Sequence, residues 1–451
     1  MNLFLRPGWG AAVLLFTSSL CADPPAAPPP APPDPFAQEL LQALRDASND
    51  PRVRAAAPPT NPDDLVPRIR IERYTLANGL DVVLAPGGSD LQAVISVTYG
   101  TGTGDCLPAR AALAHLAEHL SYRQTRHVPE GLLIATERAD ATSYNGATRT
   151  EETFYYAVVP AGSIERMLWI ESERMAFALD GLDAAALAHE QRVVINEHRQ
   201  RTTSVGWGDL AVALARELYP ESHLRRVPYA LPDGIASVTL GDVQDFLRTA
   251  YVPANARLTI TGGFDVARVR GWVERYFGSI ARAPAPPHPH PGGVVQLAGE
   301  RVLRYRVPSA QNEVLVLWPT PPLRAPGDAD LDVVAALLTR EPGGALRDAL
   351  VRSGLALTVA ARQSSYDDSS EFAIHAVVHP NHTAEQVLDA IDRTLVQMRR
   401  EASPAAQVEA VVRDWTHQTV QNAESLVGRA MLVAASPDAR DPGLLRTDLA
   451  R

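Results

Sequence analysis

Two histidines and a glutamate at helical spacing carry the strongest chemical signal in this sequence, which reads His115-Leu-Ala-Glu118-His119. Residues i and i+4 share one face of an α-helix, so both imidazoles can point at a single metal ion. Glu118 lies beside that face, where its carboxylate can take a proton from a zinc-bound water without being a ligand itself. Histidine is a common zinc ligand, and the order HxxEH occurs in zinc hydrolases. The pattern therefore predicts a zinc site; the alternative, two solvated surface histidines, is disfavoured by the flanking alanines and leucines.

A hydrolytic zinc site also needs a third protein ligand, and a second predicted helix offers candidates for it. Residues 184–201 carry Glu190 and Glu197, which are two helical turns apart and so face the same way. Glu197 suits the third ligand position, and Glu190 suits a partner that orients one of the histidines. His189 and His198 on the same helix compete for these roles, and periodicity alone does not choose between them.

The segments around these residues resemble the pitrilysin/insulinase family of zinc metallopeptidases. The resemblance extends from about Arg68 to about Ile280 and, more weakly, to the end of the chain. It includes the order of the motifs and the spacing of 78 residues from His119 to Glu197 (197 − 119). The matching segments are YTLANGLDVVL, ALAHLAEHLSYRQT, NGATRTEETFYYAVVP, EQRVVINEH and YVPANARLTITGGFD.

This resemblance implies a role for each residue of the predicted site. His115, His119 and Glu197 would bind one zinc ion, Glu118 would be the general base, and Glu190 the supporting acid. A further segment would form an edge strand that holds the substrate backbone in an extended form, by adding it to the sheet as a strand. The residues of that segment are Asn145, Gly146, Ala147 and Thr148.

The second half of the chain shows an internal duplication. Residues 156–168 (YAVVPAGSIERML) and 375–388 (HAVVHPNHTAEQVL) both read as a strand, a turn and an amphipathic helix. At the same offset, the counterpart of the zinc helix has Val334 in place of the first histidine and keeps no HxxEH. The second domain is therefore expected to repeat the fold without the metal.

One departure from the family pattern concerns this second domain. Active members of the resembled family carry an arginine and, seven residues later, a tyrosine, which steady the tetrahedral intermediate. The alignment through SGLALTV places Leu350 and Leu357 at these positions. Arg347, Arg352 and Tyr366 are candidate substitutes, but their spacing does not show that they replace the pair.

The predicted fold class is α+β, with two homologous αβ domains of antiparallel or mixed sheet flanked by helices, forming a clamshell. The expected boundaries are a signal peptide at 1–22, a proline-rich linker with a short helix at 23–66, the catalytic domain at 67–282, a proline/histidine linker at 283–296 and the non-catalytic domain at 297–451. Because the family's domain continues through a further helix and strand, the second domain is expected to be truncated.

The N-terminus predicts export from the cytoplasm. Arg6 precedes an apolar run from Trp9 to Cys21, which is shorter than the roughly 20 residues of a membrane-spanning helix and is followed by a small-residue cleavage signal. The protein is therefore expected in the periplasm or outside the cell, tethered to the membrane if Cys21 is lipidated. Cys106 is the only other cysteine, so a disulfide framework is excluded.

Composition and charge exclude other classes of function. The formal net charge of −10 argues against a dedicated nucleic-acid-binding protein, which would show a basic face or arm. The loop GTGTGD follows a predicted strand, but Asp105 stands where the dinucleotide fingerprint requires its third glycine. No apolar run after the leader is long enough to span a membrane.

The sequence therefore predicts a secreted zinc endopeptidase that acts on peptides or unfolded proteins. Its candidate partners are a second family subunit or a second copy of the chain in a homodimer. The alternative is a non-catalytic or weakly active subunit that binds peptides and pairs with a second family member. The zinc residues and Glu118 favour the enzyme, whereas the missing arginine and tyrosine favour the binding role. An adhesion or scaffold module has only the proline-rich spacer in its favour.

Overall fold

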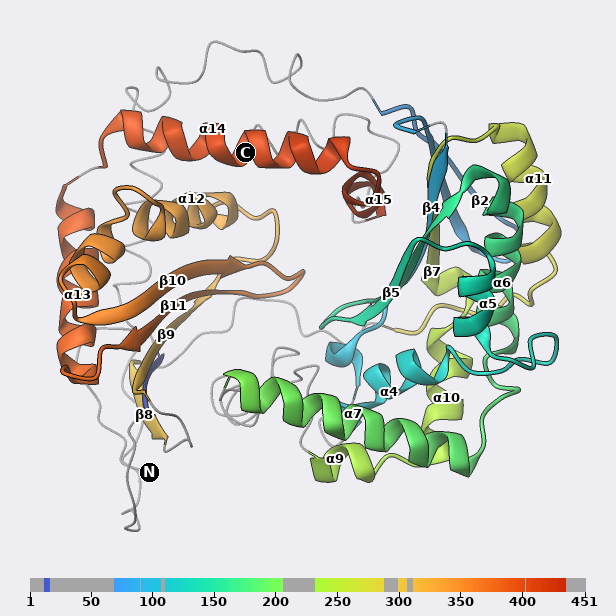
Figure 1. Ribbon diagram of the computed structural model, residues 1–451, viewed down its shortest axis with the longest axis horizontal. Coiled ribbons are helices and arrows are strands. Elements are labelled where there is room, and N and C mark those ends of the chain that lie inside the picture. Colours follow the sequence, from blue (N-terminus) through green and yellow to red (C-terminus); the bar gives the residue numbers. More distant parts are fainter. Residues whose placement is uncertain are drawn as a thin grey trace. The chain divides into compact units, whose positions relative to one another are not determined.

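The computed structural model divides the chain into two compact units, which are described separately (Figure 1). The first unit comprises residues 60–290 and 417–451, and the second comprises residues 1–59 and 291–416. The structure describes residues 12–16, 69–89, 91–106, 110–205, 232–287, 299–305, 311–401 and 403–434. Most of the predicted leader and both predicted linkers fall largely outside these ranges. Among the described residues, no helix is long and apolar enough to cross a membrane.

A six-stranded sheet organises the first unit, with the strand order β2-β3-β7-β4-β6-β5. Its strands are β2 (Glu72–Thr75), β3 (Asp81–Pro86), β4 (Gln92–Tyr99), β5 (Ser143–Thr148), β6 (Thr153–Pro160) and β7 (Ala256–Gly262). Only β3 and β7 are parallel, and the other neighbours are antiparallel. Asn78 and Gly79, a residue pair typical of hairpin turns, lie between β2 and β3, and Gly79 has the positive φ of 98° that suits a glycine. β5 ends the sheet as an edge strand.

Successive side chains of a strand point to opposite faces of the sheet, and in this unit both faces pack against other elements. Val82 and Ile95 belong to the main core, which is shared with the helices that lie between the strands in sequence. Val83 and Val94 point the other way and pack against α15 (Leu426–Ala434). The last described helix therefore packs on the first unit's sheet, although the sequence placed 297–451 in a single domain. The remaining helices of this unit are α4 (Leu113–Leu120), α5 (Leu132–Arg138), α6 (Ile164–Phe177), α7 (Ala184–Val205), α9 (Pro232–Ala236), α10 (Leu240–Ala250) and α11 (Val266–Phe277).

The second unit has a five-stranded sheet of order β10-β11-β9-β1-β8. Trp318, Phe372 and Ile374 on its strands pack against the apolar sides of its helices, including Leu338 and Ile391. The strands are β1 (Ala12–Phe16), β8 (Arg301–Tyr305), β9 (Glu313–Thr320), β10 (Ala356–Ser364) and β11 (Ser370–Val378). The helices are α12 (Asp328–Thr339), a π-helical turn at Arg347–Arg352, α13 (Ala384–Arg400) and α14 (Ala405–Glu424). The last residues of α14, from His417 on, are assigned to the first unit.

The two sheets share one topology, in agreement with the internal duplication. β8, β1, β9, β11 and β10 pair with the same relative directions as β3, β7, β4, β6 and β5. β1 thus occupies in the second sheet the place that β7 occupies in the first. This strand falls within the apolar run predicted to be a signal peptide, so its cleavage would remove a strand from the middle of the sheet. The predicted α+β class with two homologous domains is confirmed.

Candidate zinc site

The predicted zinc motif lies on α4 (Leu113–Leu120). The glycine-rich loop before this helix forms a 3₁₀ turn at Thr103–Asp105. Leu116 and Leu120 anchor α4 in the core, because both are almost completely buried. This packing places His115 and Glu118, each 7% exposed, at the inner wall of a pocket.

Three side chains from α4 and α7 converge on one point. His115 Nε2 and His119 Nε2 lie 3.3 Å apart, and Glu197 Oε2 lies 3.5 Å from the first nitrogen and 3.4 Å from the second. Among the described residues these three form the group that could hold a metal ion. His189 and His198, the competitors on α7, are not part of this group, whereas Glu197 is.

The size of this triangle fits zinc. With zinc–ligand bonds of about 2.0–2.1 Å at tetrahedral angles, neighbouring ligand atoms lie about 3.3–3.4 Å apart. The observed separations of 3.3–3.5 Å match this value without any rearrangement. Two imidazoles and one carboxylate are also a donor set that zinc accepts in hydrolytic sites, where a fourth position stays open. His115, His119 and Glu197 would therefore hold the ion.

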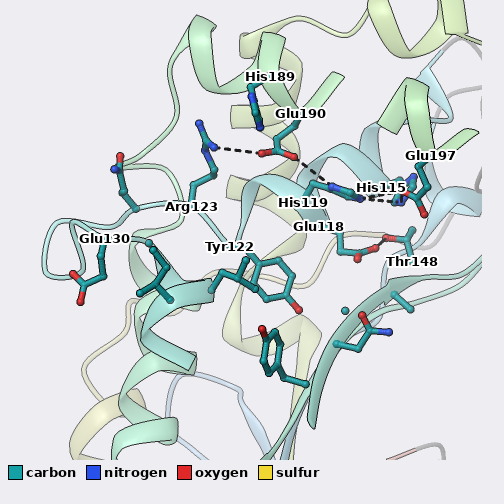
Figure 2. Close-up of a pocket in the computed structure, with 18 residues that line it drawn as sticks. His115, Glu118, His119, Tyr122, Arg123, Glu130, Thr148, His189, Glu190 and Glu197 are labelled. Atoms are coloured by element: carbon teal, nitrogen blue, oxygen red, sulfur yellow. Dashed lines mark hydrogen bonds and ion pairs between the residues drawn. The ribbon is translucent and has the colours of Figure 1, made fainter. Parts of the chain in front are cut away.

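Glu190 lies behind His119, on the side away from the triangle (Figure 2). Its Oε2 is 3.4 Å from His119 Nδ1, and its Oε1 is 3.4 Å from Nη1 of Arg123. Burial tends to raise the pKa of Glu190, but His119 and Arg123 outweigh it and hold this pKa below its ordinary value. Such an outer partner sets the tautomer and orientation of a ligand histidine. Arg123 extends this chain of contacts and was missed at the sequence level, where its position after the motif carried no signal.

The charges around His119 also bear on metal binding. Burial lowers the pKa of His119, but hydrogen bonding to Glu190 and Glu197 dominates and raises it to about 9 in the metal-free protein. A ligand histidine must be neutral, so zinc has to displace a proton from this ring. The same carboxylates therefore favour a positive charge at this point, whether a proton or a metal ion supplies it.

Glu118 points into the pocket beside the triangle and is held from strand β5. The Thr148 hydroxyl donates a hydrogen bond of 2.6 Å to Glu118 Oε2. Burial raises the pKa of the Glu118 carboxyl, and the Thr148 hydrogen bond and the His119 charge oppose only part of that effect. A carboxylate with a raised pKa is a better proton acceptor, which suits a general base.

The pocket has a volume of about 720 Å³ and opens along the edge strand. Asn145, Gly146, Ala147 and Thr148 all line it, and they belong to the edge strand β5. Leu133 and Ile134 on α5 add apolar surface to the same pocket and are 44% and 42% exposed. A polar metal-binding wall thus faces a free strand edge with apolar side chains nearby.

A buried charge supports the C-terminal end of α4. Arg174 on α6 is 1% exposed and pairs with Glu171 at 3.0 Å. Its Nη1 donates to the Ser121 carbonyl at 2.9 Å, which satisfies a backbone group just after the zinc helix. Its guanidinium also lies 4.4 Å and 4.1 Å from the ring centroids of Tyr122 and Tyr155. Sequence periodicity could not identify this cluster, since its members come from three separate elements.

Comparisons with known proteins agree with this architecture. The family model described as "Insulinase (Peptidase family M16)" matches residues 90–204, and that described as "Peptidase M16 inactive domain" matches residues 237–413. The chain is 23% identical over 358 residues to the zinc protease PqqE of Helicobacter pylori, covering 78% of this chain and 80% of that protein. It is 22% identical over 346 residues to the uncharacterized zinc protease YmxG of Bacillus subtilis, covering 75% and 81%.

Solved structures show the same fold. A protease from Helicobacter pylori superposes with a TM-score of 0.74 at 22% identity, covering 85% of this chain and 91% of that one. The first half of the periplasmic protease PqqL from Escherichia coli gives a TM-score of 0.64 at 17% identity, covering 86% of both chains.

The two homologous domains and the matched family models define a member of a zinc metallopeptidase family. One model matches residues 90–204, which include the ligand triangle, and the other matches residues 237–413, which include the last elements of the first unit and most of the second. The chain belongs to the insulinase family, peptidase family M16. The resemblance drawn from the motifs is thereby confirmed.

Proposed function

We propose that this protein is a zinc-dependent endopeptidase that hydrolyses peptides or unfolded proteins. The observation that carries the proposal is the ligand triangle of His115, His119 and Glu197, whose 3.3–3.5 Å sides suit zinc, with Glu118 beside it. Bound zinc would supply a Lewis acid that polarises the substrate carbonyl and acidifies a water molecule.

Residues of the chain would carry out the proton transfer, orient a zinc ligand and bind the substrate. Glu118 would take the proton of the attacking water, because its carboxylate is buried in the pocket wall and is not one of the three ligands. Glu190 would hold His119 with Nε2 toward the metal, since it engages Nδ1. The free edge of β5 would bind the substrate backbone as an added strand, which selects extended chains over folded proteins.

Substituting Glu118 by glutamine tests this proposal directly. The amide keeps the size and polarity of the side chain but cannot accept the proton, so zinc should stay bound while peptide hydrolysis falls about 10²- to 10⁴-fold. The assay is cleavage of a fluorogenic peptide library by zinc-loaded wild-type and variant protein, with chelator-treated wild type as the metal control. Hydrolysis by the loaded variant within a few-fold of wild type would contradict the role of Glu118.

A weakly active, peptide-binding subunit is the second candidate, and one observation favours it. At the second-domain positions where active relatives are expected to carry an arginine and a tyrosine, Leu350 is buried and Leu357 is 39% exposed. Neither side chain offers a hydrogen-bond donor to an oxyanion, and the loss of one such donor typically costs about 10²- to 10³-fold in rate. We propose that a second family subunit, which carries the arginine and the tyrosine in its own second domain, supplies this function. Kinetics of the purified chain test this: a rate of about 10 s⁻¹ or more, with no gain on adding any second subunit, would contradict it.

Export is the last part of the proposal. It is supported by Arg6, the apolar run that follows and the small residues near Ala22. The mature protein would work in the periplasm or outside the cell, tethered if Cys21 carries a lipid. Fractionation of cells that express the full chain, with mass analysis of the mature N-terminus, tests both statements.

A further inference from the structure

The general base receives its one described hydrogen bond from the strand that borders the pocket. Thr148, the last residue of β5, donates its hydroxyl proton to Glu118 Oε2 at 2.6 Å. Figure 2 shows the two side chains facing each other between α4 and the strand. The terminal torsion of a glutamate is broad, so a carboxylate without a fixed partner rotates freely. A short hydrogen bond to a charged oxygen removes that freedom.

The other carboxylate oxygen faces a second residue of the same strand, which has no side chain. A Cβ placed on Gly146 would lie 3.0 Å from Glu118 Oε1 and 2.9 Å from the Tyr122 hydroxyl. It would also lie 3.2 Å from Cδ1 of Tyr155 on the neighbouring strand β6. Any side chain at this position would therefore push against the base and the two tyrosines.

From these contacts we infer that β5 orients the general base: Thr148 is a positioning residue that fixes Oε2 of Glu118, and Gly146 leaves the room that Oε1 occupies. Oε1 is then the oxygen that takes the proton, because Oε2 already accepts the hydrogen bond from Thr148. This inference rests on the proposed peptidase function. It gives the edge strand a second task besides binding the substrate backbone.

The geometry of the strand explains how both tasks fit on six residues. Thr148 and Gly146 pair with Thr153 and Tyr155 of β6 on one side, and β5 is the last strand of the sheet on the other. Side chains of positions two apart point to the same face, so both residues meet Glu118 from one side. The main chain of β5 remains available to an extended substrate. A substrate that pairs along β5 would therefore hold the strand, and with it the base, in place.

Replacing Thr148 tests the first part of the inference. Thr148→Val keeps the shape but has no hydroxyl, and losing a hydrogen bond to a charged group should lower kcat by about 10- to 100-fold. KM and zinc content should change less than about threefold, because the strand and the ligands remain. Thr148→Ser keeps the hydroxyl and should restore kcat to within a few-fold of wild type. Thr142→Val is the matched control, since Thr142 lies just before the other end of β5 and its hydroxyl bonds only the Val158 carbonyl at 3.3 Å.

A double substitution tests the second part. Gly146→Ala should lower both kcat and the melting temperature, because its methyl group meets the Tyr122 hydroxyl at 2.9 Å. Tyr122→Phe removes that hydroxyl, so the double variant Gly146→Ala/Tyr122→Phe should recover part of both losses. The melting temperature reads out the shared space without any catalysis.

The outcomes separate the inference from the proposed function. If zinc-loaded wild type cleaves no peptide, the proposed function fails, while the melting temperatures still test the space around Gly146. If wild type is active and Thr148→Val is equally active, Thr148 is not a positioning residue. A Thr148→Ser variant as slow as Thr148→Val would also overturn that role. Strictly additive losses in the double variant would overturn the part assigned to Gly146.

Discussion

The zinc ligands and their supporting carboxylate should differ in a measurable order of importance. Glu197 contributes a ligand atom to the triangle, whereas Glu190 acts only through His119 Nδ1. Replacing each by glutamine keeps the size and removes the charge. We therefore expect Glu197→Gln to lose most of its zinc and Glu190→Gln to bind zinc more weakly but measurably.

The structure allows the size of the smaller effect to be estimated. Loss of an outer partner typically costs 10- to 100-fold in metal affinity, or about 1.4 to 2.7 kcal/mol. The Glu190–His119 contact is long at 3.4 Å, and Glu190 also engages Arg123 at 3.4 Å. Its effect should therefore be near the lower end, about tenfold. Removal of Glu197 leaves two imidazoles as the protein ligands and should cost more than 100-fold.

Competition titration with a chromophoric zinc chelator measures these affinities on purified protein, with circular dichroism as a check on folding. His189→Gln is the matched control, because His189 lines the same pocket on the same helix but is exposed and outside the triangle. Its affinity should equal that of wild type. Full zinc affinity in Glu197→Gln together with loss in His198→Gln would refute the ligand assignment.

Two further predictions concern the second unit. Partial desolvation and the nearby Asp328 raise the pKa of Asp332 to about 6, although the residue is exposed at the surface, where water screens the effect. The folded state therefore binds this proton more tightly than the unfolded state, and its contribution to stability is lost as pH rises from about 4 through 6. Asp332→Asn should weaken the fall in stability between about pH 4 and 6 and raise the free energy of unfolding at pH 8 by about 1 kcal/mol, a value that allows for solvent screening. Urea denaturation at several pH values measures both effects. An unchanged pH dependence of the free energy of unfolding would contradict the prediction. A chain that starts at residue 23 lacks β1, which pairs with both β8 and β9. The backbone amides of β8 and β9 should therefore exchange hydrogen faster in the shortened chain than in the full chain, whereas those of β4 and β7 should not change. Equal protection of β8 and β9 in both chains would show that β1 does not stabilise the sheet.

Short-range patterns in the sequence predicted much of the first unit. Asn78-Gly79 indicated the hairpin of β2 and β3, and the i, i+4 spacing of His115 and His119 indicated a shared helix face. These features depend on residues close in sequence, where turn geometry and helical periodicity are reliable. The choice of Glu197 over His198 needed the fold, because it depends on which side of α7 faces α4.

The role of the glycine-rich loop before α4 depends on tertiary contacts that the sequence pattern does not reveal. The glycine-rich loop before α4 suggested phosphate binding only weakly, and the structure shows a different use for its amides. The backbone NH groups of Thr103 and Gly104 donate to the carbonyls of Arg149 and Thr150 in the turn between β5 and β6. These bonds join the 3₁₀ turn at Thr103–Asp105 to the turn between β5 and β6, ahead of helix α4. The partner carbonyls lie more than 40 residues away, beyond any local pattern.

Among the described residues, the candidate metal site lies in only one of the two duplicated units. In the first unit, helix α4 reaches the edge strand through the bond of Glu118 to Thr148. In the second unit, helix α12 makes a similar polar contact, because Asp328 accepts hydrogen bonds from Gln363 on β10 and from Ser365 just after it. A carboxylate that joins the helix to the edge strand is thus present in both. At the offset of the duplication, α12 carries Val334 and Leu338 in place of the two histidines and Leu337 in place of Glu118. Asp328 is therefore not the counterpart of the proposed base, although it too joins a helix to an edge strand.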